Sequence, residues 1–268
     1  NLDIARDLVK KSDRVGLGLL FGDVSDTLSQ LIRTAIIAKE GYTLCVADFS
    51  AIEARVIAWL SGETWRQKVF AEGGDIYCAS ASSMFGVPVV KHGVNGHLRQ
   101  KGKVAELALG YCGGVNALKA MGALDMGLSE EELPNIVALW RQASPKIKEL
   151  WYTVEKAAVY TVTTGNPMTI EHGITFRLEV DPFYGYRYMT IELPSGRKLF
   201  YPDPHIKLNN FDKEAVHFKT QLNNAWVTES TYGGKLVENI TQAVARDCLA
   251  LTLMRLYDNG LPAIMHIR

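Results

Sequence analysis

Residues 46–55 read Val46-Ala47-Asp48-Phe49-Ser50-Ala51-Ile52-Glu53-Ala54-Arg55, and the hydrophobic pattern changes within this stretch. The apolar run 42–47 is typical of a buried strand that ends at Asp48. The apolar residues then recur at helical spacing until a glycine closes the helix: Ile52, Val56, Trp59, Leu60 and finally Gly62. The stretch therefore predicts a strand followed directly by a helix.

Asp48 stands at the end of this predicted strand. A carboxylate in that position can direct a hard oxygen ligand into a cleft, which suits Mg2+, and the backbone carbonyl of Phe49 is a second candidate ligand. The alternative is structural: Asp48 or Ser50 caps the helix, and Ser50 forms with Glu53 the S-x-x-E pattern of a capping box. These residues alone leave both interpretations open.

A second motif places a side chain of interest at every fourth position: Arg99, Lys103, Leu107 and Tyr111. Such residues form a slowly winding stripe on one helix, and the stripe is about 18 Å long. Arg99 and Lys103 can bind a triphosphate, with the sugar and base near Leu107 and Tyr111. The alternative is an amphipathic helix with a basic flank and Tyr111 packed in the core.

Two glycines interrupt the same predicted helix. Gly102 and Gly110 each cost about 1 kcal/mol inside a helix. Such a cost is explained where the backbone must come close to a ligand or to another helix.

The composition is that of a soluble globular protein: 268 residues, of which 47% are hydrophobic and 22% charged. We expect no membrane segment and no signal peptide, and the start at Asn1 suggests a fragment.

The four cysteines are scattered, which argues against zinc or disulfides and favours a cytoplasmic setting. The net charge of zero counts mildly against nucleic-acid binding. Residues 91–103 are nevertheless rich in basic side chains, and they form either a phosphate-binding face or a solvated basic face.

The remaining pattern predicts helices followed by strands. Helices are expected at 2–11, about 25–35, 64–92 with a loop at 73–74, about 98–111, 134–160 with a cap at Ser129, and about 234–258. Residues 168–201 alternate like strands, with a hairpin whose turn is Pro194-Ser195-Gly196, and another apolar strand is expected at 261–267.

Together the two motifs closely resemble those of the family A DNA polymerases, in particular the phage members. The first family motif, D-[YF]-S-x-I-E-x-R, is similar to residues 48–55, and the R-x3-K-x3-x-x3-Y helix motif is similar to residues 99–111. The separation of 51 positions from Asp48 to Arg99 is also similar to the spacing in the family. The stretch Ile32–Ala38 resembles the segment that precedes the first motif in the family. Residues 242–247 resemble the family's palm helix. The resemblance covers about 31–267, except about 161–229.

This resemblance implies a role for each matched residue. Asp48 would ligate two Mg2+ ions, with help from the carbonyl of Phe49. Glu53 would be a steric gate against a ribose 2′-OH. Arg99 and Lys103 would bind the incoming dNTP, with Lys103 a candidate proton donor to pyrophosphate. The remaining roles are contacts to the nucleotide by Leu107 and Tyr111, minor-groove contact by Gln242, and further DNA contacts by Arg55, Lys235, Asn239 and His266.

The sequence departs from the family pattern at several positions. Leu107 replaces a common Phe, Ala51 a common Gln and Cys112 a usual Gly, while Gly234 and Glu238 stand where an Arg and an Asn are usual. The family carries His-Asp-Glu in a strand after the palm helix, and Arg268 aligns with that His. The second metal carboxylate would come next, so we expect this chain to extend a primer poorly.

The resulting prediction is an α/β (α+β) fold made of a polymerase palm sheet, mostly helical fingers and a β-rich insertion. We expect palm at 1–62, fingers at 63–160, the insertion at 161–229 and the rest of the palm at 230–268. The expected partners are primer–template DNA, dNTPs and the exonuclease and thumb segments of a parent polymerase, in the cytoplasm of a bacterium or infected host. The alternatives are a single-subunit RNA polymerase and a non-catalytic DNA- or nucleotide-binding module.

Overall fold

The computed structural model describes residues 2–266, and the chain forms two compact units, residues 1–50 and residues 51–268. The boundary lies within the first motif, so Asp48 belongs to the first unit and Glu53 to the second. Within the described part of the chain, no helix combines the length and apolar character needed to cross a membrane.

Short helices build the first unit. They are α1 (Leu2–Lys10), α2 (Arg14–Phe21), α3 (Val24–Leu31) and the 3-10 helix η1 (Ile32–Ala35). Ala5, Leu17 and Leu31 form a small core between them. The helices expected at 2–11 and about 25–35 are confirmed, whereas α2 was not expected, because the glycines at 16 and 18 weaken its helical pattern.

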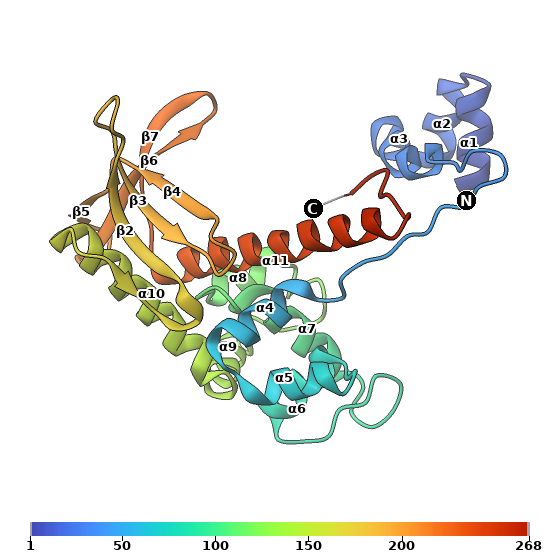
Figure 1. The fold of residues 1–268 in the computed structure, drawn as a ribbon. Helices are drawn as coiled ribbons and strands as arrows, with labels where there is room; N and C mark the ends of the chain where they lie inside the picture. The colour runs from blue at the N-terminus through green and yellow to red at the C-terminus, as the bar shows by residue number, and fades with distance from the viewer. Residues whose placement is uncertain (1, 267–268) are drawn as a thin grey trace. The chain divides into compact units, whose positions relative to one another are not determined.

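The second unit has a helical part and a β-rich part (Figure 1). Its helices are α4 (Ile52–Ser61), α5 (Thr64–Ala71), α6 (Ile76–Phe85), α7 (Leu98–Leu109), α8 (Val115–Ala120), α9 (Leu133–Ala143), α10 (Pro145–Thr164) and α11 (Gly233–Asp258). The long helix α10 contacts α4, α11 and strands of both sheets, so it joins the two parts. One hydrophobic core runs through both, and within it the rings of Trp140 and Trp151 stack 6.2 Å apart.

Two antiparallel sheets form within the described residues. The first has the order β1 (Met168–Thr169), β2 (Thr175–Val180), β3 (Arg187–Glu192), β4 (Lys198–Pro202); the second has the order β5 (His205–Leu208), β6 (Glu214–Leu222), β7 (Ala225–Ser230). A short 3-10 helix, η2 (Glu171–Gly173), separates β1 from β2. The expected hairpin pairs Glu192 with Lys198 across its turn. The mixed helix-and-sheet fold class and the β-rich segment are therefore confirmed.

Two expected strands do not form. Residues 42–47 and the described part of the expected strand 261–267 have no regular structure, and Val46 is 95% exposed. A strand exists only where a neighbouring strand accepts and donates its backbone hydrogen bonds. No such pairing involves these segments within residues 2–266, so the expected palm sheet around Asp48 is absent from the described structure. Residues 267 and 268, including the position aligned with the family His, lie outside the described residues.

The start of α4 also differs from the expectation. The N-cap position is Ala51, with a left-handed φ of 52°, and not Ser50. Ala51 has no side chain that can accept a hydrogen bond, so the capping box expected from Ser50 and Glu53 is wrong in its register. The Glu53 carboxylate instead accepts a hydrogen bond from Tyr111, which follows α7.

Gly102 is explained by the packing of α6 against α7. A Cβ atom added at Gly102 would overlap the carbonyl oxygen of Tyr77 and lie 3.0 Å from the Cβ of Ala81. The glycine therefore allows the two helix backbones to approach, as the sequence suggested. Gly110, the C-cap of α7, has no such neighbour, since its added Cβ would lie 3.8 Å from the Glu106 carbonyl oxygen.

We expect Gly102→Ala to lower the free energy of unfolding by about 1–3 kcal/mol, because the overlap forces α6 and α7 apart. Gly110→Ala is the matched control and is expected to leave stability within about 0.5 kcal/mol of the original or to raise it. Urea unfolding followed by tryptophan fluorescence measures both. Equal stability of the two variants would show that the close approach of the helices is not needed.

Candidate functional site

The expected stripe lies on α7 and on the residues that follow it. Arg99, Lys103 and Leu107 are on the helix, and Tyr111 follows two residues after its end. The opposite face of α7 is buried through Val104, Ala105, Ala108 and Leu109. Leu107 is 46% exposed, while Arg99 and Lys103 are half-buried. The helix is thus amphipathic, and its outward face carries the two cations in line.

The cations on α7 differ in their partners. Arg99 Nε donates a 2.8 Å hydrogen bond to Asp75 Oδ2, and its guanidinium lies 5.2 Å from the Tyr77 ring centroid. Lys103 has no ion-pair partner within residues 2–266, whereas Lys101, two residues earlier, pairs with Glu132. Lys103 therefore remains available to an anionic ligand.

Sequence reasoning missed Asp75 and Tyr77. Asp75 precedes a helical pattern and has the signature of a helix cap, which the structure confirms. Its pairing with Arg99 depends on the contact between α6 and α7, and no local sequence pattern predicts that contact.

Tyr111 connects α7 with α4. Its hydroxyl donates a 2.9 Å hydrogen bond to Glu53 Oε2. Burial raises the pKa of the Tyr111 hydroxyl, and the nearby carboxylates of Glu53 and Glu238 raise it further. The phenol therefore stays protonated and holds the Glu53 carboxylate in place. Tyr111 also packs against the main core, so both of its expected roles, core residue and site residue, are compatible with its position.

The start of α11 packs closely against Tyr111. A Cβ added at Gly234 would overlap the Tyr111 carbonyl oxygen and lie 2.5 Å from the Cβ of Cys112. This contact explains why a glycine stands where the family usually has an arginine: a larger residue would push α11 away from the end of α7. The junction of α4, α7 and α11 thereby brings Glu53, Tyr111 and Glu238 together.

The candidate DNA contacts on α11 have different surroundings. Gln242 is half-buried. Asn239 donates through Nδ2 to the Tyr201 hydroxyl at 2.9 Å, and Lys235 Nζ donates to Glu238 at 3.0 Å. Asn239 therefore has a structural partner in the β-rich part.

The turn between β3 and β4 is attached to α11 beside Gln242. Arg197 donates through Nε to Asp247 Oδ1 and through Nη2 to the carbonyl of Ala243, both at 2.7 Å. The hydroxyl of Ser195 donates to Asp247 Oδ2 at 2.6 Å. The β-rich segment is thus fixed to the helix that carries Gln242, and no local sequence pattern predicts this arrangement.

The remaining candidate residues are Asp48, Phe49, Arg55 and His266. Asp48 and Phe49 belong to the first unit and are exposed in an irregular segment. Arg55 lies with its guanidinium 4.4 Å from the Phe70 ring centroid, and His266 is exposed. Within residues 2–266, no three His, Cys, Asp or Glu side chains come together as a metal site. Asp48 offers one carboxylate and Phe49 one carbonyl, both hard oxygens of the kind that Mg2+ takes together with phosphates and water.

Comparison with known protein families identifies the family of this chain. The model of DNA polymerase family A matches residues 23–168, which is more than half of the 268 residues. The chain belongs to DNA polymerase family A. The resemblance inferred from the two motifs is therefore confirmed.

Relatives in this family include a DNA polymerase of Bacillus phage SP02, which is 52% identical over 100% of this chain and 41% of its own length. The thermostable DNA polymerase I of Thermus thermophilus is 37% identical over 47% of this chain and 14% of its own length. DNA polymerase I of Rhizobium leguminosarum is 38% identical over 37% of this chain and 9% of its own length. The chain thus spans less than half the length of each of these family A relatives.

Proposed function

We propose that this chain is the palm and fingers part of a template-directed DNA polymerase. It would transfer a dNMP to the 3′-OH of a primer. The palm would comprise 1–62 and 230–268, the fingers 63–160, and the insertion 161–229. The proposal rests chiefly on one observation: the cationic stripe of α7 ends at a tyrosine that holds the Glu53 carboxylate at 2.9 Å in a family A chain.

Each motif residue has a task in this proposal. Phosphoryl transfer needs positioning and neutralisation of charge more than covalent chemistry. Arg99 and Lys103 would hold the triphosphate, and Lys103 would donate a proton to the leaving pyrophosphate. Tyr111 and Leu107 would contact the base and sugar, and Gln242 the minor groove of the primer end.

Two Mg2+ ions are the implied cofactor, and Asp48 with the carbonyl of Phe49 would hold them. When bound, such ions would neutralise the negative charge that develops on the phosphates. The oxygen ligands of both residues and the exposure of Asp48 suit this role. Primer–template DNA, dNTPs and other segments of a parent polymerase would be the partners, in the cytoplasm of a bacterium or infected host.

A template-dictated complex tests the proposal. The chain is mixed with Mg2+ and a fluorescent primer–template whose primer ends in a dideoxynucleotide, and each dNTP is added in turn. The complementary dNTP is expected to tighten DNA binding about tenfold or more relative to the other three, because only it forms the base pair. Equal effects of all four dNTPs would reject template-directed synthesis and favour the non-catalytic binding module.

Glu53 distinguishes a DNA polymerase from the related single-subunit RNA polymerases. Because Tyr111 fixes the carboxylate, Glu53 cannot easily turn away from a ribose 2′-OH. In the same ternary complex, Glu53→Ala is expected to reduce the preference for dATP over ATP about tenfold. Tyr111→Phe, which removes the hydrogen bond but keeps the ring, is expected to reduce it less. A wild-type chain that binds ATP as tightly as dATP would favour the RNA polymerase.

A further inference from the structure

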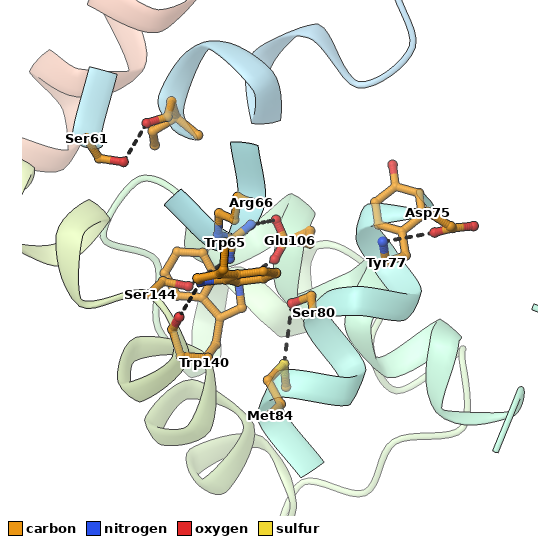
Figure 2. A network of polar contacts seen from close by, with 12 residues as sticks. Ser61, Trp65, Arg66, Asp75, Tyr77, Ser80, Met84, Glu106, Trp140 and Ser144 are labelled. Atoms are coloured by element: carbon orange, nitrogen blue, oxygen red, sulfur yellow. Dashed lines mark hydrogen bonds and ion pairs between the residues drawn. The ribbon is translucent and has the colours of Figure 1, made fainter. Parts of the chain in front are cut away.

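Asp75 uses its two carboxylate oxygens for different purposes. Oδ1 accepts hydrogen bonds from the backbone amides of Tyr77 at 2.9 Å and Cys78 at 3.2 Å, and so caps α6. Figure 2 shows the first of these bonds. Oδ2 accepts the hydrogen bond from Arg99 Nε at 2.8 Å. One side chain thus connects the start of α6 with the start of α7.

Arg99 is held in a way that leaves most of its hydrogen-bond donors available. Nε donates to Asp75, and the guanidinium also interacts with the thiol of Cys78. The Tyr77 ring, 5.2 Å from the guanidinium carbon, supports one face of the group. A guanidinium grips phosphate oxygens through two parallel N–H groups, and the Nη1–Nη2 edge can still do so.

The carboxylate remains charged near neutral pH. Burial alone would raise the pKa of Asp75, but the hydrogen bonds from Arg99 and from the amides of Cys78 and Tyr77 outweigh it and lower the pKa. The hydrogen bond that Arg99 donates to Asp75 in turn raises the pKa of Arg99. The side chains are 27% and 23% exposed, so water still reaches the pair.

We propose that Asp75 is a positioning residue for nucleotide binding, which holds the Arg99 guanidinium so that its Nη1–Nη2 edge faces an incoming triphosphate. The inference rests on the proposed function, because it assigns Arg99 to the triphosphate. A flexible arginine loses rotamer freedom when it binds a ligand, and a carboxylate that fixes it beforehand removes part of that cost. Asp75 also reduces the positive charge felt by the phosphates, but it occupies only one of the five N–H donors of the guanidinium.

Asp75→Asn separates positioning from capping. Asparagine caps helices about as well as aspartate, so α6 keeps its cap and the thermal midpoint is expected to change little. The charge that holds Arg99 is lost. We expect the Kd of a complementary dNTP, in the ternary complex with dideoxy-ended primer–template and Mg2+, to rise about 3- to 10-fold.

A double-mutant cycle with Arg99→Ala decides whether Asp75 acts through Arg99. We expect Arg99→Ala to weaken dNTP binding, and Asp75→Asn to add no further loss in that variant. Losses that multiply would show that Asp75 acts independently and would overturn the inference, as would an Asp75→Asn chain that binds dNTP as tightly as the original or more tightly. If Arg99→Ala itself binds dNTP normally, the proposed role of Arg99 fails, and that of Asp75 fails with it.

Discussion

Glu106→Ala is expected to lower the free energy of unfolding by about 3–5 kcal/mol, because it leaves the buried guanidinium of Arg66 without its carboxylate. Arg66 is fully buried and Glu106 is 5% exposed at the side chain. Glu106 Oε2 accepts from Arg66 Nη1, and Oε1 accepts from Trp140 Nε1 at 2.9 Å. Figure 2 shows these residues converging from α5, α7 and α9.

Arg66 has further partners in the same network. Its Nη2 donates to the Ser144 hydroxyl at 2.7 Å, and its guanidinium lies 4.6 Å from the Trp65 ring centroid. These contacts hold the charge in place but do not neutralise it. Unpaired burial of such a group is costly, whereas an apolar replacement of both partners is tolerated.

The double replacement Arg66→Met with Glu106→Leu is therefore the control. This double variant is expected to lose less free energy of unfolding than Glu106→Ala alone, although the single change removes fewer atoms. Urea unfolding can be followed by fluorescence, since Trp65 and Trp140 belong to the network. A Glu106→Ala chain within about 1 kcal/mol of the original would show that the ion pair contributes little.

Lys103→Ala is expected to weaken binding of a complementary dNTP about 10- to 100-fold, because it removes a charge-assisted contact to phosphate. Lys103 lies one turn after Arg99 on the outward face of α7 and has no ion-pair partner within residues 2–266. The measurement is titration of the dNTP into the ternary complex with dideoxy-ended primer–template and Mg2+.

Lys101→Ala is the matched control for this measurement. Lys101 is on the same helix and carries the same charge, but it pairs with Glu132. Its removal is expected to change the dNTP Kd by no more than about twofold, because Glu132 already balances its charge. Similar losses for both lysines would mean that the general charge of α7, and not the position of Lys103, governs nucleotide binding.

Local patterns predicted α7, α11 and the hairpin, but not α2 or α8. The period of apolar residues marked α7 and α11, and the Pro194-Ser195-Gly196 turn marked the hairpin of β3 and β4. These features depend on residues close in sequence, so the sequence reports them directly.

The expected strands at 42–47 and 261–267 show the limit of such patterns. An apolar run has the composition of a strand, but its backbone needs a partner strand, and none pairs with these segments within residues 2–266. The capping box failed for a related reason: α4 begins one residue later than the pattern implied, at the left-handed Ala51.

The family and the α7 stripe follow from the sequence alone, because both depend on the order and spacing of residues such as Arg99 and Lys103. The side chains that hold these residues follow from the packing of the helices. Asp75 meets Arg99 from 24 positions away, and Tyr111 meets Glu53 from 58 positions away. Such contacts arise from helix packing, permitted at Gly102 and Gly234 by the missing Cβ atoms, and helix packing brings together residues with no common local pattern.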